Sequence, residues 1–185
     1  MNEILARLTA DGLINTGVEG GFNNVCCSTA YDSLCLSVSS WEQERGQALL
    51  SMIDGAEKFM SRPYSDLSDD EIEELSTLLD SEQGHEAALI ILSEDCYEYV
   101  EAVRCEGVTN PKCIVYCAMW CPTSTYIVCR TICHAYQEGI DVDDIDELAD
   151  YFYNNYATLA GCEEYEEGYQ NRSLAQLEYV KGLGV

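Results

Sequence analysis

The spacing of apolar residues predicts a mainly helical chain. Residues 42–60 give the clearest pattern, because their apolar side chains recur every three to four positions and form one stripe on a helix. The stripe consists of Ala48, Leu49, Met52, Ile53, Ala56, Phe59 and Met60. A first helix is predicted over residues 2–16, with Asn2 as its N-cap. Its apolar face is formed by Ile4, Leu5 and Leu8.

Local start and stop signals predict the remaining helices. Ser68 and Glu71 have the spacing of a capping box. Asn110 followed by Pro111 is a typical helix start, and the segment after it is apolar nearly all round, so we expect it to be central. Pro122 ends that helix. Further helices are predicted over residues 94–104 after a Ser93 cap, over 123–136, from Asp141 onward and over 171–181.

Residues 20–40 interrupt the helical period. They are rich in Gly, Asn, Ser and Cys, and hydrophobic residues alternate only in Val25–Ala30 and Leu34–Val38. Such a pattern predicts a loop with a small β-ribbon. The expected fold is therefore mainly α, with an irregular β-ribbon near residues 20–40. We expect one domain over residues 1–185, with the acidic C-terminal helices of residues 141–185 packed as part of it.

Composition bounds the class of protein. Hydrophobic residues make up 47% of the 185 residues, which is enough for a sizeable core. No apolar run approaches the length that a membrane helix needs, so we expect no membrane insertion. The first residues lack a basic region followed by an apolar stretch, so no signal peptide is predicted. The protein is expected to be made in the cytoplasm, and to need a partner if it acts outside it.

The charge of −25, from 34 acidic and 9 basic side chains, excludes one class and leaves two interpretations. Direct binding to nucleic acid is not expected, because so few cations cannot form a basic patch. The acidic side chains either keep the surface solvated or mimic nucleic acid and bind a basic protein. The acidic runs are residues 66–74, 141–147 and 163–167.

The 11 cysteines are odd in number, so they cannot all pair internally. Without a signal peptide, a reducing compartment is expected. Cys113, Cys117 and Cys121 recur every four residues, but eight residues of helix rise about 12 Å, too far for one metal ion. We expect these thiols to be small core residues and predict no metal site. His85 and His134 are too few for a catalytic or metal constellation.

One carboxylate stands out as a candidate catalytic group. Glu19 follows the first predicted helix and precedes Gly20, Gly21 and Phe22, so it can lie at a cleft wall. Glycosidic cleavage needs an acid that stays protonated, and burial against apolar groups raises the pKa of the catalytic glutamate of lysozyme to about 6. Phe22 and Trp41 are candidate apolar walls. A second carboxylate is usual; Asp32 is the first candidate for it and Glu42 the next.

Several segments, in order, resemble a family of phage-type lysozyme-like peptidoglycan hydrolases (endolysins or muramidases). The family's site region is resembled by four parts of the chain. They are residues 19–25 (Glu-Gly-Gly-Phe-Asn-Asn-Val), Asp32, Trp41 and residues 45–50 (Arg-Gly-Gln-Ala-Leu-Leu). Residues 75–84, 95–99 and 107–111 resemble later segments, and Tyr169, Arg172 and Tyr179 resemble its closing motif. The resemblance covers most of the chain and implies a lysozyme-like helical fold.

The resemblance also implies an activity. It implies a hydrolase of phage origin that degrades the glycan strand of peptidoglycan at the cell wall, with Glu19 as general acid and no cofactor. Some lysozyme-like enzymes use a single glutamate, so the resemblance leaves open whether Asp32 is needed as second carboxylate. Substrate-binding residues would be Phe22, Ser37, Ser40 and Trp41. The chain departs from the family pattern in its groove, where Ser40 replaces Gln, Glu42 replaces His and Ser37 replaces Gly. The alternative is a catalytically inactive acidic inhibitor, such as a DNA mimic that blocks a basic defence protein.

Overall fold

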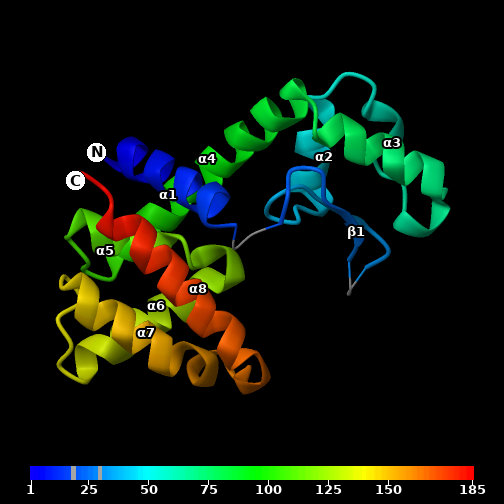
Figure 1. The fold of residues 1–185 in the computed structure, drawn as a ribbon. Coiled ribbons are helices and arrows are strands. Elements are labelled where there is room, and N and C mark those ends of the chain that lie inside the picture. The colour runs from blue at the N-terminus through cyan, green and yellow to red at the C-terminus, as the bar shows by residue number, and fades with distance from the viewer. Residues whose placement is uncertain (18–19, 29–30) are drawn as a thin grey trace. The chain divides into compact units, whose positions relative to one another are not determined.

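The computed structural model of the chain describes residues 1–17, 20–28 and 31–185. They are mainly helical with one small antiparallel sheet, which confirms the predicted fold class (Figure 1). Two compact units are distinguished: unit 1 comprises Met1–Val18 and Ser93–Val185, and unit 2 comprises Glu19–Leu92. Helix α4 (Glu82–Cys105) contributes residues to both. The prediction of a single domain stays a prediction. Within the described ranges, no helix is long and apolar enough to cross a membrane.

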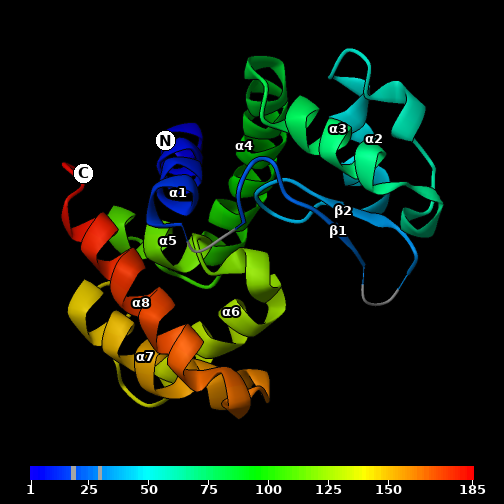
Figure 2. The ribbon, with the colours of Figure 1, turned by 45° about the vertical axis from the view of Figure 1, so that its right-hand side comes forward.

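Unit 1 is a set of helices around α5 (Pro111–Ala118), in which residues 113–118 are all buried. Helices α1 (Asn2–Thr16), α6 (Cys121–Gln137), α7 (Ile145–Ala160) and α8 (Glu166–Lys181) pack against it (Figure 2). The predicted central position of the helix after Pro111 is therefore confirmed. A short 3-10 helix, η3 (Glu163–Tyr165), precedes α8.

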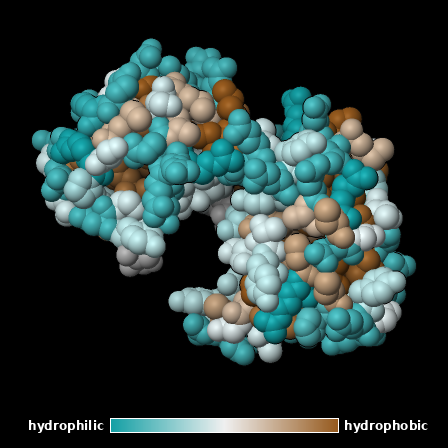
Figure 3. All heavy atoms as spheres, turned by 180° about the vertical axis from the view of Figure 1, so that it is seen from behind, coloured by the Kyte–Doolittle hydropathy of each residue, from teal (hydrophilic) through white to brown (hydrophobic). Residues whose placement is uncertain are grey.

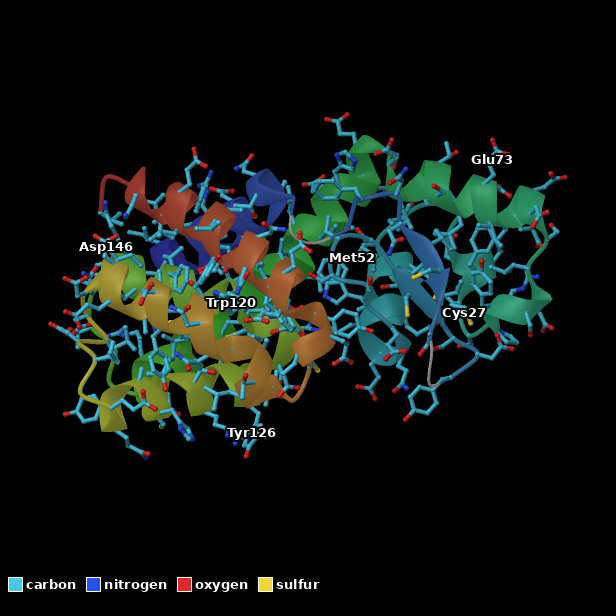
Figure 4. All side chains as sticks on the ribbon, turned by 60° about the horizontal axis from the view of Figure 1, so that its bottom comes forward. Cys27, Met52, Glu73, Trp120, Tyr126 and Asp146 are labelled. Atoms are coloured by element: carbon cyan, nitrogen blue, oxygen red, sulfur yellow. The ribbon has the colours of Figure 1, made fainter. Side chains whose placement is uncertain are left out.

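The core of unit 1 is an aromatic cluster. Trp120 is 0% exposed, and its ring centroid lies 4.3 Å from that of Tyr156 and 5.5 Å from that of Phe152. Tyr116 packs edge-on against Phe152 at 5.6 Å. Figure 4 shows Trp120 among the helices of this unit. Such rings bury large apolar areas and favour offset or edge-to-face contacts, so this cluster accounts for much of the unit's packing.

Unit 2 combines the sheet with short helices. Strands β1 (Val25–Cys27) and β2 (Leu34–Leu36) form an antiparallel hairpin, and the order is then α2 (Gln43–Ser51), η1 (Glu57–Phe59), η2 (Tyr64–Asp66) and α3 (Asp69–Leu79). The predicted β-ribbon near residues 20–40 is therefore present. The core is mainly aliphatic, with Leu36, Leu49, Leu50, Leu75 and Leu79 each 0% exposed.

The capping signals were largely correct. Ser68 caps α3 in a complete capping box with Glu71. Asn110 is the N-cap of α5, directly before Pro111, and its side chain accepts a hydrogen bond from the Lys112 amide. Asp141 is not the cap of α7; Asp144 accepts from the amides of residues 146 and 147 instead. Asn2 likewise lies inside α1, which has Met1 as N-cap.

Some helix bounds differ from the prediction. The helix predicted over residues 42–60 ends at Ser51, and the chain then turns through Gly55, whose φ of +85° a helix cannot contain. Ser93 caps no helix, because α4 runs continuously through it. Helix α8 begins at Glu166, earlier than predicted. In α1, Ile4 is exposed, and the buried face runs instead through Leu5, Ala6, Thr9, Ala10, Gly12 and Leu13.

The visible face of each unit is mostly hydrophilic, as expected for a chain with so many carboxylates (Figure 3).

The three cysteines of the predicted core group, Cys113, Cys117 and Cys121, are buried. Burial raises the pKa of the Cys113 thiol to about 12. These thiols therefore stay protonated and act as small core residues, as predicted. Cys129 is half-buried, and Cys133 is exposed.

Candidate functional site

The approach to the candidate acid is helix α1. This helix ends at Thr16, and Gly17 follows in a left-handed conformation with a φ of 63°. Glycine adopts that conformation at little cost, so the chain can leave the helix sharply at this point. Glu19 lies outside the described residues, and its role as general acid stays a prediction.

Phe22 is half-buried against a histidine of α4. Its ring stacks on the His85 imidazole, with the centroids 4.0 Å apart and the planes at 24°. The neighbouring Asn23 carbonyl accepts a hydrogen bond of 2.8 Å from the Ser76 hydroxyl on α3. These contacts hold the glycine-rich segment on unit 2, and they give His85 a packing role that its position in the sequence did not indicate.

A tight turn carries the two predicted groove serines. Backbone hydrogen bonds of 2.9 Å in both directions between Leu36 and Trp41 close the turn. Ser37 and Ser40 both have a positive φ, of 62° and 49°. Ser40 is exposed, and its hydroxyl accepts from the Asn24 side chain at 3.4 Å. Ser37 is 0% exposed, so its hydroxyl does not face solvent. The substrate-binding roles of both stay predictions.

Trp41 is a core residue of unit 2, with only 5% of its surface exposed. Helix α2 comes very close to its backbone, because a Cβ at Gly46 would lie 3.1 Å from the Trp41 carbonyl oxygen. The glycine of the Arg45-Gly46-Gln47 element therefore permits this packing. In this structure the indole packs the core beneath the hairpin rather than offering a broad open face to a sugar.

The Asp32 side chain is hydrogen-bonded to Ser65 in η2 of unit 2. Its carboxylate accepts hydrogen bonds from the Ser65 hydroxyl and, at 2.9 Å, from the Ser65 amide. These two bonds lower the pKa of Asp32. The side chain is thus an anion at neutral pH. An anion can serve as a base or nucleophile but not as a proton donor. The role of Asp32 as second carboxylate stays a prediction.

Glu42, the next candidate for second carboxylate, lies beside strand β2. Its Oε2 atom is 3.2 Å from the Ser33 hydroxyl and 4.0 Å from the Cys35 sulfur. Glu42 is also the N-cap residue of α2. The hairpin therefore brings Glu42, Ser33 and Cys35 together, a grouping that the linear sequence did not reveal because it depends on the strand register.

Unit 1 contains a pocket that sequence reasoning missed. Its volume is about 520 Å³, within the usual range for small-ligand sites. It is lined by Thr16, Tyr165, Gly168, Tyr169, Asn171, Arg172 and Ala175. Tyr165 is 62% exposed, so part of its ring is open to solvent. The cue was present in the sequence, as the two tyrosines 165 and 169 spaced four apart at the start of the last helix, but only the fold brings Thr16 to them.

The Arg172 side chain on α8 is held in place beneath this pocket. Its Nη2 donates to the Met119 carbonyl at 2.7 Å, and the guanidinium lies 5.5 Å from the centroid of the Trp120 ring. The aromatic face favours this cation position. In a strongly acidic chain, the pocket therefore includes a positively charged wall.

Among the residues that the structure describes, no group of three or more His, Cys, Asp or Glu side chains could hold a metal ion. Comparisons with protein-family models, with curated proteins and with solved structures find no match to this chain.

Proposed function

We propose that this chain is a lysozyme-like glycosidase that cleaves the glycan strand of peptidoglycan, with Glu19 as its general acid. The observation that carries the proposal is where the closing motif packs. Tyr169 and Arg172 line one pocket with Thr16, and the Tyr179 hydroxyl donates to the Leu8 carbonyl at 2.8 Å. The closing motif near the end of the sequence thus packs on α1, the helix that leads to Glu19.

The chemistry assigns different protonation states to two carboxyl groups. Glu19 would protonate the leaving glycosidic oxygen, which requires its neutral form. Asp32, whose pKa is lowered by Ser65, would be the anionic partner, either as nucleophile or as base for a water molecule. Glycosidic hydrolysis by such a pair of carboxyl groups needs no cofactor.

The pocket of unit 1, taken by itself, is proposed to bind one sugar of a glycan strand. Tyrosine has an apolar ring face and a polar hydroxyl, so Tyr165 and Tyr169 suit the apolar face of a pyranose. Asn171 and Arg172 add polar groups in the same wall. N-acetylated sugars present both kinds of surface, and the free peptide carboxylates of the cell wall would be attracted to the arginine.

The first experiment is digestion of purified bacterial walls by the wild type and by Glu19→Gln. We expect the wild type to release soluble fragments and the variant to lose at least about 100-fold of that activity, since proton transfer by a positioned side chain contributes roughly 10²–10⁴-fold. Glu73→Gln is the matched control, because Glu73 is exposed and points away from α3 (Figure 4). Equal activity of wild type and Glu19→Gln would refute the role of Glu19. A wild type inert on walls from several bacteria would favour the acidic binding protein.

The pocket is tested by Tyr165→Ala, for which we expect a several-fold higher KM and a smaller change in kcat. Tyr126→Ala is the control, because Tyr126 is also exposed in unit 1 and projects outward from α6 (Figure 4). If both tyrosine variants have the KM of the wild type, the sugar does not bind at Tyr165.

A further inference from the structure

Two free thiols face each other across the hairpin of unit 2. Cys26 on β1 is the direct register partner of Cys35 on β2, and both are half-buried with no disulfide. Directly opposed residues of an antiparallel pair project from the same face of the sheet. The Cys26 side chain also hydrogen-bonds the Cys35 thiol, so the two thiols are neighbours on that face.

The ladder identifies the type of pair. Backbone hydrogen bonds of 2.9 Å join Ser37 to Asn24 at one end of the hairpin and Ser28 to Ser33 at the other. Because hydrogen-bonded pairs alternate along an antiparallel ladder, the pair midway between them, Cys26 and Cys35, is also of the hydrogen-bonded kind. Such pairs have Cα atoms about 5.5 Å apart, within the range found in disulfides. Their Cβ atoms are about 5.5 Å apart and must approach to roughly 3.8 Å for the bond to form.

We propose that Cys26 and Cys35 are a reversible thiol–disulfide pair, oxidised to a cross-strand disulfide by a low-molecular-weight disulfide such as oxidised glutathione. This inference is independent of the proposed glycosidase activity. It concerns a modification site on the hairpin whose loop contains Asp32 and beside which Glu42 lies.

The reaction balances in two exchanges. The Cys26 thiolate attacks one sulfur of oxidised glutathione, forms a mixed disulfide and releases one glutathione thiolate. The Cys35 sulfur then attacks the Cys26 sulfur and releases the second glutathione. The Cys35 proton leaves by way of the Glu42 carboxylate, 4.0 Å from the sulfur, and ends on the departing glutathione. Two protein thiols are oxidised and one glutathione disulfide is reduced to two thiols.

The order of attack follows from the surroundings of Cys35. Burial first, and then the negative charges of Cys26 and Glu42, raise the pKa of the Cys35 thiol to about 11. A thiol attacks a disulfide as its thiolate, so Cys35 is a poor first nucleophile. Once Cys26 is in a mixed disulfide it no longer carries a charge, and Cys35 is already adjacent to the sulfur that it must attack.

The neighbouring cysteine provides a matched control. Cys27 is exposed, but its register partner is Leu34. Successive side chains of a strand point to opposite faces, so Cys27 points away from Cys35. Cys27 is therefore at least as accessible to the oxidant as Cys26, but its side chain points to the opposite face of the sheet from Cys35.

The test uses the reduced full-length chain, incubated with oxidised glutathione under native conditions, alkylated and cleaved before Asp32. That cleavage separates Cys26 and Cys27 from Cys35, so a linked pair of peptides reports the disulfide by mass. We expect at least a tenfold greater yield of the linked pair in the wild type and in Cys27→Ser than in Cys26→Ser. A linked pair that persists in Cys26→Ser, or that is absent from the wild type, would overturn the proposal.

A second variant separates the chemistry from folding. In Cys35→Ser the second exchange is impossible, so one glutathione should remain on Cys26, and the tryptophan fluorescence should stay that of the folded protein. A folded Cys35→Ser without glutathione on Cys26 would contradict the proposed order. In urea, the preference of Cys35 for Cys26 over Cys27 should disappear, since it depends on the strand register.

Discussion

Units 1 and 2 differ in how their backbones turn. In unit 1, the described residues with a positive φ are all glycines: Gly17, Gly107, Gly139 and Gly161. In unit 2, four residues with side chains adopt this conformation: Ser37, Ser40, Gln43 and Ser61. A left-handed conformation costs a residue with a Cβ about 1–2 kcal/mol, so unit 2 contains backbone strain that unit 1 avoids.

The difference in backbone strain coincides with a difference between the packed core of unit 1 and the candidate site residues of unit 2. Unit 1 has the aromatic cluster around Trp120. In unit 2, three of the strained residues, Ser37, Ser40 and Gln43, lie in one turn. The first two are the predicted groove serines, and the same turn contains Trp41 and Glu42. Strain that persists in a fold is concentrated at functional sites. We therefore interpret the turn at residues 36–43 as the functional part of unit 2 and the Trp120 cluster as the principal source of stability in unit 1.

The largest effect should come from Trp120→Ala. The indole is 0% exposed and packs on Tyr156, Phe152 and Tyr116, and loss of a buried aromatic side chain costs about 3–5 kcal/mol. Urea unfolding followed by circular dichroism should show that loss. Trp41 is the other of the two tryptophans, so its fluorescence reports unit 2 in this variant. A loss below about 1 kcal/mol would contradict the assignment of the cluster as the main source of stability.

Substitutions at residues with a positive φ should change the free energy of unfolding of the two units in opposite directions. Gly161 ends α7 with a φ of 69°, and Gly161→Ala should destabilise unit 1 by about 1 kcal/mol. Ser61 has a φ of 58°, and Ser61→Gly should stabilise unit 2 by at most about 1 kcal/mol, since the backbone strain is relieved while chain entropy opposes it. Single-tryptophan variants report each unit separately. Shifts of the same sign in both variants would refute the contrast.

The smallest effect is a pH dependence confined to unit 2. Glu71 accepts from the Arg62 guanidinium at 2.7 Å and from the Ser68 amide at 3.0 Å, and these bonds lower its pKa from 4.5 to about 2. Because the folded pKa is the lower one, the stabilisation is complete above about pH 4.5 and is lost as the pH falls towards 2. Glu71→Gln should flatten this dependence in Trp41 fluorescence titrations, and Glu73→Gln should not. An unchanged slope in Glu71→Gln would contradict it.

Local signals in the sequence predicted much of the fold. The capping box at Ser68, the Asn110-Pro111 start and the β-ribbon near residues 20–40 depend on neighbours a few positions apart, and all three were found. The helix over residues 42–60 was predicted too long, because its apolar stripe continues beyond Gly55 although the backbone turns there. Apolar periodicity records which side chains are buried, and a 3-10 helix and turns can bury them as well.

Less of the candidate site could be predicted. The partnership of Asp32 with Ser65 joins positions far apart in the sequence, and the opposition of Cys26 and Cys35 depends on a strand register that the hydrophobic pattern did not fix. The pocket beside Thr16 requires α8 to pack on α1, which no local signal encodes. The sequence offered the residue types for each of these features, and only the fold supplies their neighbours.

The most direct test of the account is wall digestion in H₂¹⁸O with mass analysis of the fragments. A hydrolase with Glu19 as general acid adds one water across each broken glycosidic bond, so every new reducing end should carry one ¹⁸O in the wild type, and Glu19→Gln should release almost none of these fragments. Labelled fragments released equally by Glu19→Gln, or fragments without ¹⁸O at a new sugar end, would contradict the assignment.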